Sequence, residues 1–134
     1  MQWNLLTTTL TANALFSGLS GMLLTIAAAP MAHWLGIPTW ISFAVGGGLV
    51  LFSVQVAMTA RNPQPTAVRM VITGDAAWVV SAIVLIAVFP ESMSVQGLVA
   101  LGIVTIGVAV LAALQWIGLR LVIRKTATTV MSMS

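Results

Sequence analysis

The run AVRMVITGDAAWVVSAIVLIAVF, residues 67–89, places a carboxylate, Asp75, inside an almost entirely apolar segment. A transmembrane helix needs about 20 predominantly apolar residues, so this run is long enough to cross a bilayer. A charge at that depth is costly, and an acid inside a membrane segment marks a functional site by default. The rest of the chain must therefore supply groups that neutralise Asp75 or hydrogen-bond to it.

The composition is that of a membrane protein. Of the 134 residues, 60% are hydrophobic and 5% are charged, whereas soluble domains carry about 25% charged residues. The absence of cysteine excludes disulfides and thiolate metal sites. A single histidine leaves no histidine metal cluster, so we expect no metal and no cofactor. The net charge of +3 does not indicate nucleic-acid binding, because the basic residues lie at the ends of apolar segments.

Four segments are long and apolar enough to span a membrane. We predict helices over about residues 5–29, 38–60, 67–89 and 95–123, in one transmembrane domain (1–125) with a short frayed tail (126–134). Thr66 is expected to cap the third helix and Ser92 or Ser94 the fourth. We expect the first segment to be retained, because its apolar run exceeds the roughly 7–15 residues of a signal-peptide core. The expected fold is an all-α antiparallel four-helix membrane bundle.

The five basic residues all fall on one side of this predicted bundle. They flank the second loop or end the fourth helix: Arg61, Arg69, Arg120, Arg124 and Lys125. The positive-inside rule makes that side cytoplasmic, so both termini are predicted to be cytoplasmic. Trp3, Trp34 and Trp40 lie near the predicted membrane interfaces, where indole rings concentrate.

The two halves of the chain look alike. Gly47-x-x-Val50-Leu51-x-x-x-Gln55 matches Gly107-x-x-Val110-Leu111-x-x-x-Gln115, and Asn13-Ala-Leu-Phe16 aligns with Asp75-Ala-Ala-Trp78. This pattern predicts a repeat of two helical hairpins, related by an axis along the membrane normal.

Each predicted helix carries one polar side chain at similar depth, about 8–12 Å inside the cytoplasmic boundary. These residues are Asn13, Gln55, Asp75 and Gln115. Helical spacing groups each with small or apolar residues: Asn13 with Ser17, Ser20 and Gly21; Gln55 with Gly47, Leu51 and Thr59; Asp75 with Trp78 and Ala82; Gln115 with Gly107, Leu111 and Gly118. If all four faces point inward, they form a ring of three amides and one carboxylate.

Several alternatives stay open at this site. Arg120 is the best candidate to neutralise Asp75, but its long side chain can equally extend outward to lipid phosphates. Otherwise Asp75 is protonated, because burial favours a neutral carboxyl group. Asp75 is either a proton or cation site or a structural hydrogen-bond anchor, and the three amides either support such a site or hold helices together. Trp78 either stacks on a flat ligand such as a quinone or packs against other helices.

Asn-Ala-x-Phe-Ser-Gly-x-x-Gly at residues 13–21 and Gly-Asp-x-x-Trp at 74–78 resemble the small four-helix bacterial inner-membrane proteins of the DoxX-like kind. The resemblance implies a multi-pass protein of a bacterial inner membrane and transfers no catalytic residue. The chain does not match the small multidrug transporters, which need a glutamate in the first helix where Asn13 stands here.

No Ser/His/Asp set, phosphate loop or carboxylate pair is present, so we expect no enzyme. The first hypothesis is a proton- or cation-linked transport or permeation protein whose binding candidates are Asp75, Asn13, Gln55, Gln115, Arg120 and Trp78. The second is a non-catalytic accessory subunit of a larger membrane complex, and the third is a quinone, lipid or haem binder. The expected partners are the lipid bilayer and either further copies of the chain or a larger membrane complex, and not nucleic acid.

Overall fold

Residues 2–134 are described by a computed structural model, with side chains from Asn4 onward, so the side chain of Trp3 lies outside the described residues. The elements are α1 (Gln2–Ile26), α2 (Ala28–Leu35), α3 (Thr39–Arg61), α4 (Pro65–Val88), the 3-10 turn η1 (Pro90–Ser92) and α5 (Val95–Met133). Four of them, α1, α3, α4 and α5, are long and apolar enough to cross a membrane. These four apolar helices indicate a small multi-pass integral membrane protein in contact with lipid.

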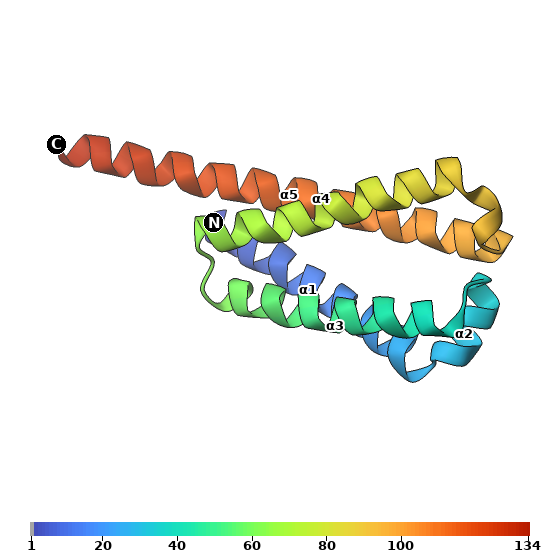
Figure 1. Cartoon of the computed structure of the whole chain (residues 1–134). Coiled ribbons are helices and arrows are strands. Elements are labelled where there is room, and N and C mark those ends of the chain that lie inside the picture. Colours follow the sequence, from blue (N-terminus) through green and yellow to red (C-terminus); the bar gives the residue numbers. More distant parts are fainter. Residues whose placement is uncertain (1) are drawn as a thin grey trace.

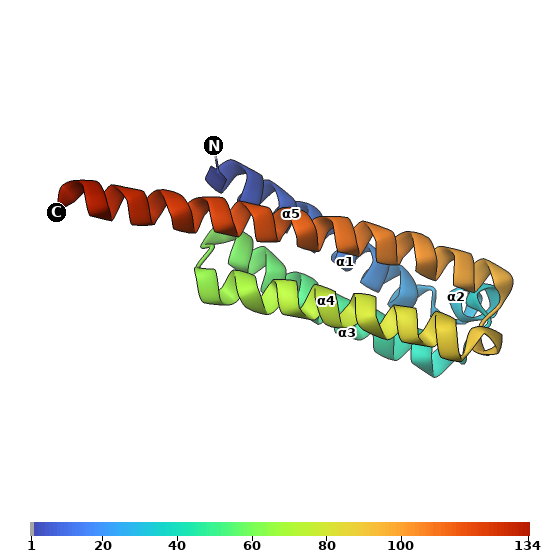
Figure 2. The same ribbon diagram turned by 90° about the horizontal axis from the view of Figure 1, so that it is seen from above.

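The four long helices lie side by side, and consecutive ones connect at opposite ends of the molecule (Figures 1 and 2). The N-terminus and the α3–α4 turn lie at one end, and α2 and η1 lie at the other. The most extensive packing joins α1 to α3, followed by α4 to α5 and α1 to α5, whereas α3 and α4 make few contacts. The C-terminal part of α5 projects beyond the bundle.

The predicted helix boundary near residue 29 is wrong, because α1 ends at Ile26 and a separate short helix, α2, follows. Pro30 does not break the chain there. It lies in the first turn of α2, where its missing N–H would have no helical acceptor. Gly36 ends α2 with a φ of 72°, a left-handed conformation that glycine adopts without steric cost.

Of the two predicted N-caps, the one on α4 is absent and the one on α5 is present. α4 starts at Pro65 after Gln64 and has no side-chain cap, so the expected cap at Thr66 is wrong. Ser94 does cap α5, because its Oγ accepts the N–H of Gly97 at 3.0 Å. Ser94 also reaches the α2 end, where its Oγ donates to the Trp34 carbonyl at 2.8 Å and its N–H to the Leu35 carbonyl at 3.0 Å. This residue therefore ties the two hairpins together at that end.

The tail at 126–134 is not frayed, because α5 continues to Met133. No glycine or proline follows Lys125 to stop the helix. The hydroxyls of Thr126, Thr128 and Thr129 each bond to the carbonyl four residues earlier, as helical threonines do.

The interface between α1 and α3 depends on two glycines. A Cβ on Gly21 would lie 2.7 Å from the carbonyl oxygen of Gly46 and 2.8 Å from the backbone N of Val50. Across the same interface, Ser42 Oγ donates to the Leu24 carbonyl at 3.0 Å. Small residues of this kind let membrane helices approach closely.

Replacing Gly46 with alanine is expected to lower the free energy of unfolding by about 1–3 kcal/mol, because the added methyl overpacks the interface. Its Cβ would lie 2.8 Å from both the Gly21 carbonyl oxygen and the Thr25 backbone N. Gly47→Ala is the matched control, because a Cβ there meets nothing within 4 Å. The measurement is denaturant unfolding of both variants in the same detergent. Equal effects of the two substitutions would contradict the close approach.

Candidate functional site

Asp75 lies in the middle of α4, and its side chain is 3% exposed. Asn13 Nδ2 of α1 donates a hydrogen bond to Asp75 Oδ2 at 2.7 Å. Ser17 Oγ, one turn further along α1, donates to Asn13 Oδ1 at 3.1 Å and orients that amide. The helices α1 and α4 otherwise make few contacts, so this polar chain is a direct link between them. The structure thus brings together Asn13 and Asp75, the two residues that the predicted repeat aligns.

Gln115 is buried, as expected, but it does not join this hydrogen-bonded chain. Its side chain is 0% exposed, and neither amide atom, Nε2 or Oε1, has a hydrogen-bond partner among the described residues. A buried unpaired polar group costs about 1–3 kcal/mol. The predicted ring of three amides around Asp75 is therefore wrong at this position.

Gln55 is exposed, so the prediction that it faces inward is also wrong. On its predicted face, Leu51 is 75% exposed and only Thr59 is buried. The buried face of α3 comprises Ser42, Gly46, Ser53, Val56 and Thr59. Neighbouring helical positions differ by about 100°. Packing Gly46 rather than Gly47 against α1 therefore turns Gln55 outward.

Arg120 does not neutralise Asp75. It is exposed on α5, and its guanidinium carbon lies 5.1 Å from the centroid of the Trp116 ring. Arg69, Arg120 and Arg124 border a shared surface pocket near the end where the N-terminus lies. The Arg120 side chain thus extends outward, and Asp75 has no basic partner among the described residues.

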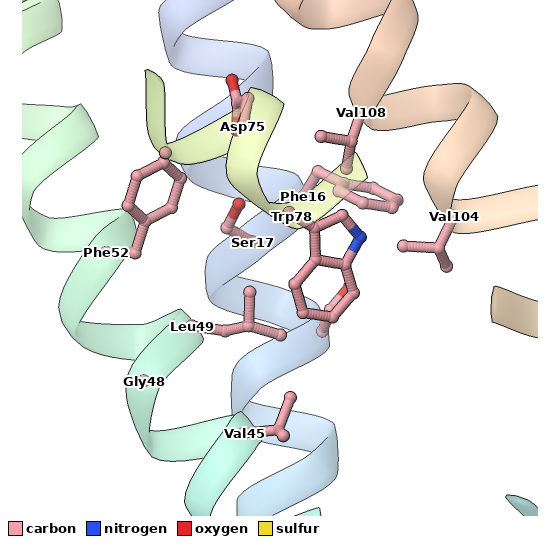
Figure 3. Close-up of a pocket in the computed structure, with 12 residues that line it drawn as sticks. Phe16, Ser17, Val45, Gly48, Leu49, Phe52, Asp75, Trp78, Val104 and Val108 are labelled. Atoms are coloured by element: carbon pink, nitrogen blue, oxygen red, sulfur yellow. The ribbon is translucent and has the colours of Figure 1, made fainter. Parts of the chain in front are cut away.

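A cavity of about 290 Å³ lies beside Asp75, lined by all four long helices. Three aromatic side chains border it: Phe16 of α1, Phe52 of α3 and Trp78 of α4 (Figure 3). Trp78 Nε1 is buried and has no hydrogen-bond partner in the described part of the chain. Trp78 was expected at the site, but Phe16 and Phe52 were not. Phe16 follows Asn13 at helical spacing and could have been found, whereas no pattern pointed to Phe52.

The site offers few ligands for a metal. Among residues 2–134, no three His, Cys, Asp or Glu side chains lie together. The chemistry available is that of one carboxyl group next to a mostly apolar cavity. Such a group can hold a proton, accept a hydrogen bond or balance a cation.

Neither family models nor curated proteins nor solved structures match this chain.

Asn13→Leu is expected to lower the free energy of unfolding by about 1–3 kcal/mol, because it leaves Asp75 Oδ2 without its donor. Gln115→Met should leave stability unchanged or raise it, because it removes two unpaired polar atoms and preserves volume. Denaturant unfolding of the two variants measures the difference. A loss of stability in Gln115→Met as large as in Asn13→Leu would mean that the Gln115 amide has a partner.

Proposed function

We propose that this chain is a small transport or permeation protein of a bacterial inner membrane, in which Asp75 binds and releases a proton or a cation. The observation that carries the proposal is the buried Asp75 carboxyl, which has one neutral hydrogen-bond donor, no basic partner and a cavity at its side. A charge in such surroundings must be neutralised by a proton or by a bound cation. If the proton and the cation exchange at this one carboxyl group, the movement of one across the membrane is coupled to the movement of the other.

The fold in this proposal is an antiparallel bundle of two related hairpins, α1–α3 and α4–α5. The strongest packing occurs within each hairpin. Asn13 and Asp75 occupy aligned places in the two hairpins and bond to each other, as residues near a common axis would. The resemblance to DoxX-like proteins is part of the same proposal, and it suggests that the membrane is a bacterial inner membrane.

The orientation we propose places both termini in the cytoplasm. The arginines Arg61 and Arg69 flank the α3–α4 turn at the same end as the N-terminus, and Glu91 lies in η1 at the other end. This distribution follows the positive-inside rule.

The working unit in this proposal is a homo-oligomer. The partly open cavity beside Asp75 measures about 290 Å³, which is at the lower limit of ordinary ligand pockets of about 300–1,000 Å³. A continuous pathway across the membrane would need a second copy of the chain. No catalytic step is part of this function.

Asp75→Asn is expected to abolish proton flux, because an amide cannot take up or release the proton. The measurement is the pH inside proteoliposomes, reported by a trapped dye after a cation gradient is imposed. Glu91→Gln is the matched control, because Glu91 is the other acidic residue of the chain and lies in η1. Flux that persists at the normal rate in Asp75→Asn would reject the proposed role. Purification with a stoichiometric partner protein, and no flux from the lone chain, would favour an accessory subunit.

A further inference from the structure

The cavity beside Asp75 adjoins a second, apolar cavity of about 300 Å³ toward the α2 end. The two share five lining residues: Ser20, Val45, Leu49, Trp78 and Val104. The second cavity, here called the outer chamber, is bordered by aliphatic side chains such as Leu23, Leu85 and Leu101. The two adjoining cavities extend from Asp75 toward the α2 end, with a carboxyl group beside one and a hydrocarbon lining around the other.

The side-chain oxygens of these two cavities are too few for Mg²⁺ or Ca²⁺. Among the described lining residues, Ser17, Ser20 and Asp75 supply the side-chain oxygens of the first cavity. Mg²⁺ and Ca²⁺ require about six to eight oxygen ligands. The aromatic side chains of Phe16, Phe52 and Trp78 line the same cavity as Asp75, and ring faces attract organic ammonium groups.

Trp78 lies between the two cavities. Its indole lines both cavities, and Nε1 is buried without an acceptor. An ammonium ion offers this N–H no acceptor, so Trp78 contributes to the site through its ring rather than through Nε1.

We propose that the site binds an amphiphilic organic ammonium ion, with the ammonium group at Asp75 among the three aromatic rings and the hydrocarbon chain in the outer chamber. This substrate class rests on the proposed function and specifies the cation that exchanges with the proton. The Asp75 carboxyl group must first release its own proton to solvent. Only then can a permanently charged ammonium ion balance the carboxylate. Proton and ammonium ion therefore compete for the same oxygen atoms, and one replaces the other.

The competition predicts a pH dependence with a defined sign. Below the pH at which Asp75 loses its proton, apparent affinity for a permanently charged ammonium ion falls by up to tenfold per pH unit. The side chains that face Asp75 do not titrate: Asn13 and Ser17 of α1, Phe52 of α3 and Val108 of α5. The pH dependence should therefore disappear in Asp75→Asn.

The experiment measures binding of dodecyltrimethylammonium to the full chain in lipid nanodiscs by calorimetry, after subtraction of empty nanodiscs. We expect saturable binding, at least tenfold weaker binding in Asp75→Asn, and retention in Asp75→Glu, which keeps the carboxylate. Dodecanol, which has the chain without the charge, and tetramethylammonium, which has the charge without the chain, should each bind at least tenfold more weakly. Unfolding curves of the variants confirm that the bundle is intact.

A second pair of variants tests the outer chamber. Ala100→Phe places a ring in the chamber, so it should remove most of the advantage of the dodecyl chain and leave tetramethylammonium binding unchanged. Val99→Phe, at a neighbouring position that is 57% exposed, is the matched control and should bind like the unmodified chain.

Binding of dodecanol as strong as that of the ammonium ion, or equal binding in Asp75→Asn, would overturn the inference and indicate a neutral ligand such as a quinone or lipid. Proton flux that depends on Asp75 without ammonium binding would overturn the substrate class and leave the proposed function standing. Ammonium binding without any proton flux would overturn the proposed transport function and leave the ligand class standing.

Discussion

The hydrogen bond from Asn13 to Asp75 is the interaction on which the interior of this bundle depends. In a membrane, the apolar faces of helices gain little from contacting each other rather than lipid, so small residues and polar bonds decide which faces meet. The bond joins α1 to α4, two helices that make few other contacts, and so adds a polar connection in mid-bundle to the packing of α1 on α5. At the α2 end, Ser94 makes a second polar connection between the hairpins through the Trp34 and Leu35 carbonyls. The two adjoining cavities extend from the level of the first connection toward the second.

The close contact of Gly21 with Gly46 decides which side of α3 faces these cavities. Because the backbones of α1 and α3 meet there, the buried face of α3 runs through Ser42, Gly46 and Ser53. Val45 and Leu49 consequently border the cavities, and Phe52 borders the one beside Asp75. Gln55 lies on the side of α3 opposite Gly46 and is exposed. The position of Phe52 beside the cavity is thus a consequence of backbone packing about one to two helical turns away.

The two buried amides show that burial of a polar side chain does not by itself bring it into a hydrogen bond with Asp75. Asn13 and Gln115 are both almost completely buried, yet Asn13 bonds to Asp75 and Ser17 whereas the Gln115 side chain has no partner among the described residues. Arg120 was also expected near Asp75 and also lies elsewhere, because its guanidinium group lies over the Trp116 ring. Asp75 is therefore held by a neutral donor, which leaves its charge to be balanced by a proton or a ligand.

The sequence alone determined the features that follow from the free energy of moving residues between water and lipid. These are the four apolar spans, the placement of the basic residues near their ends, and the depth and inward direction of Asn13 and Asp75. Only the tertiary structure decided the rotation of α3, the pairing of Asn13 rather than Gln115 with Asp75, the outward course of Arg120 and the existence of the two cavities. The physical reason is that hydropathy depends on residue type and spacing. The rotation of one helix against another depends instead on contacts such as that of Gly21 with Gly46, and a shift of one residue in those contacts turns a side chain by about 100°.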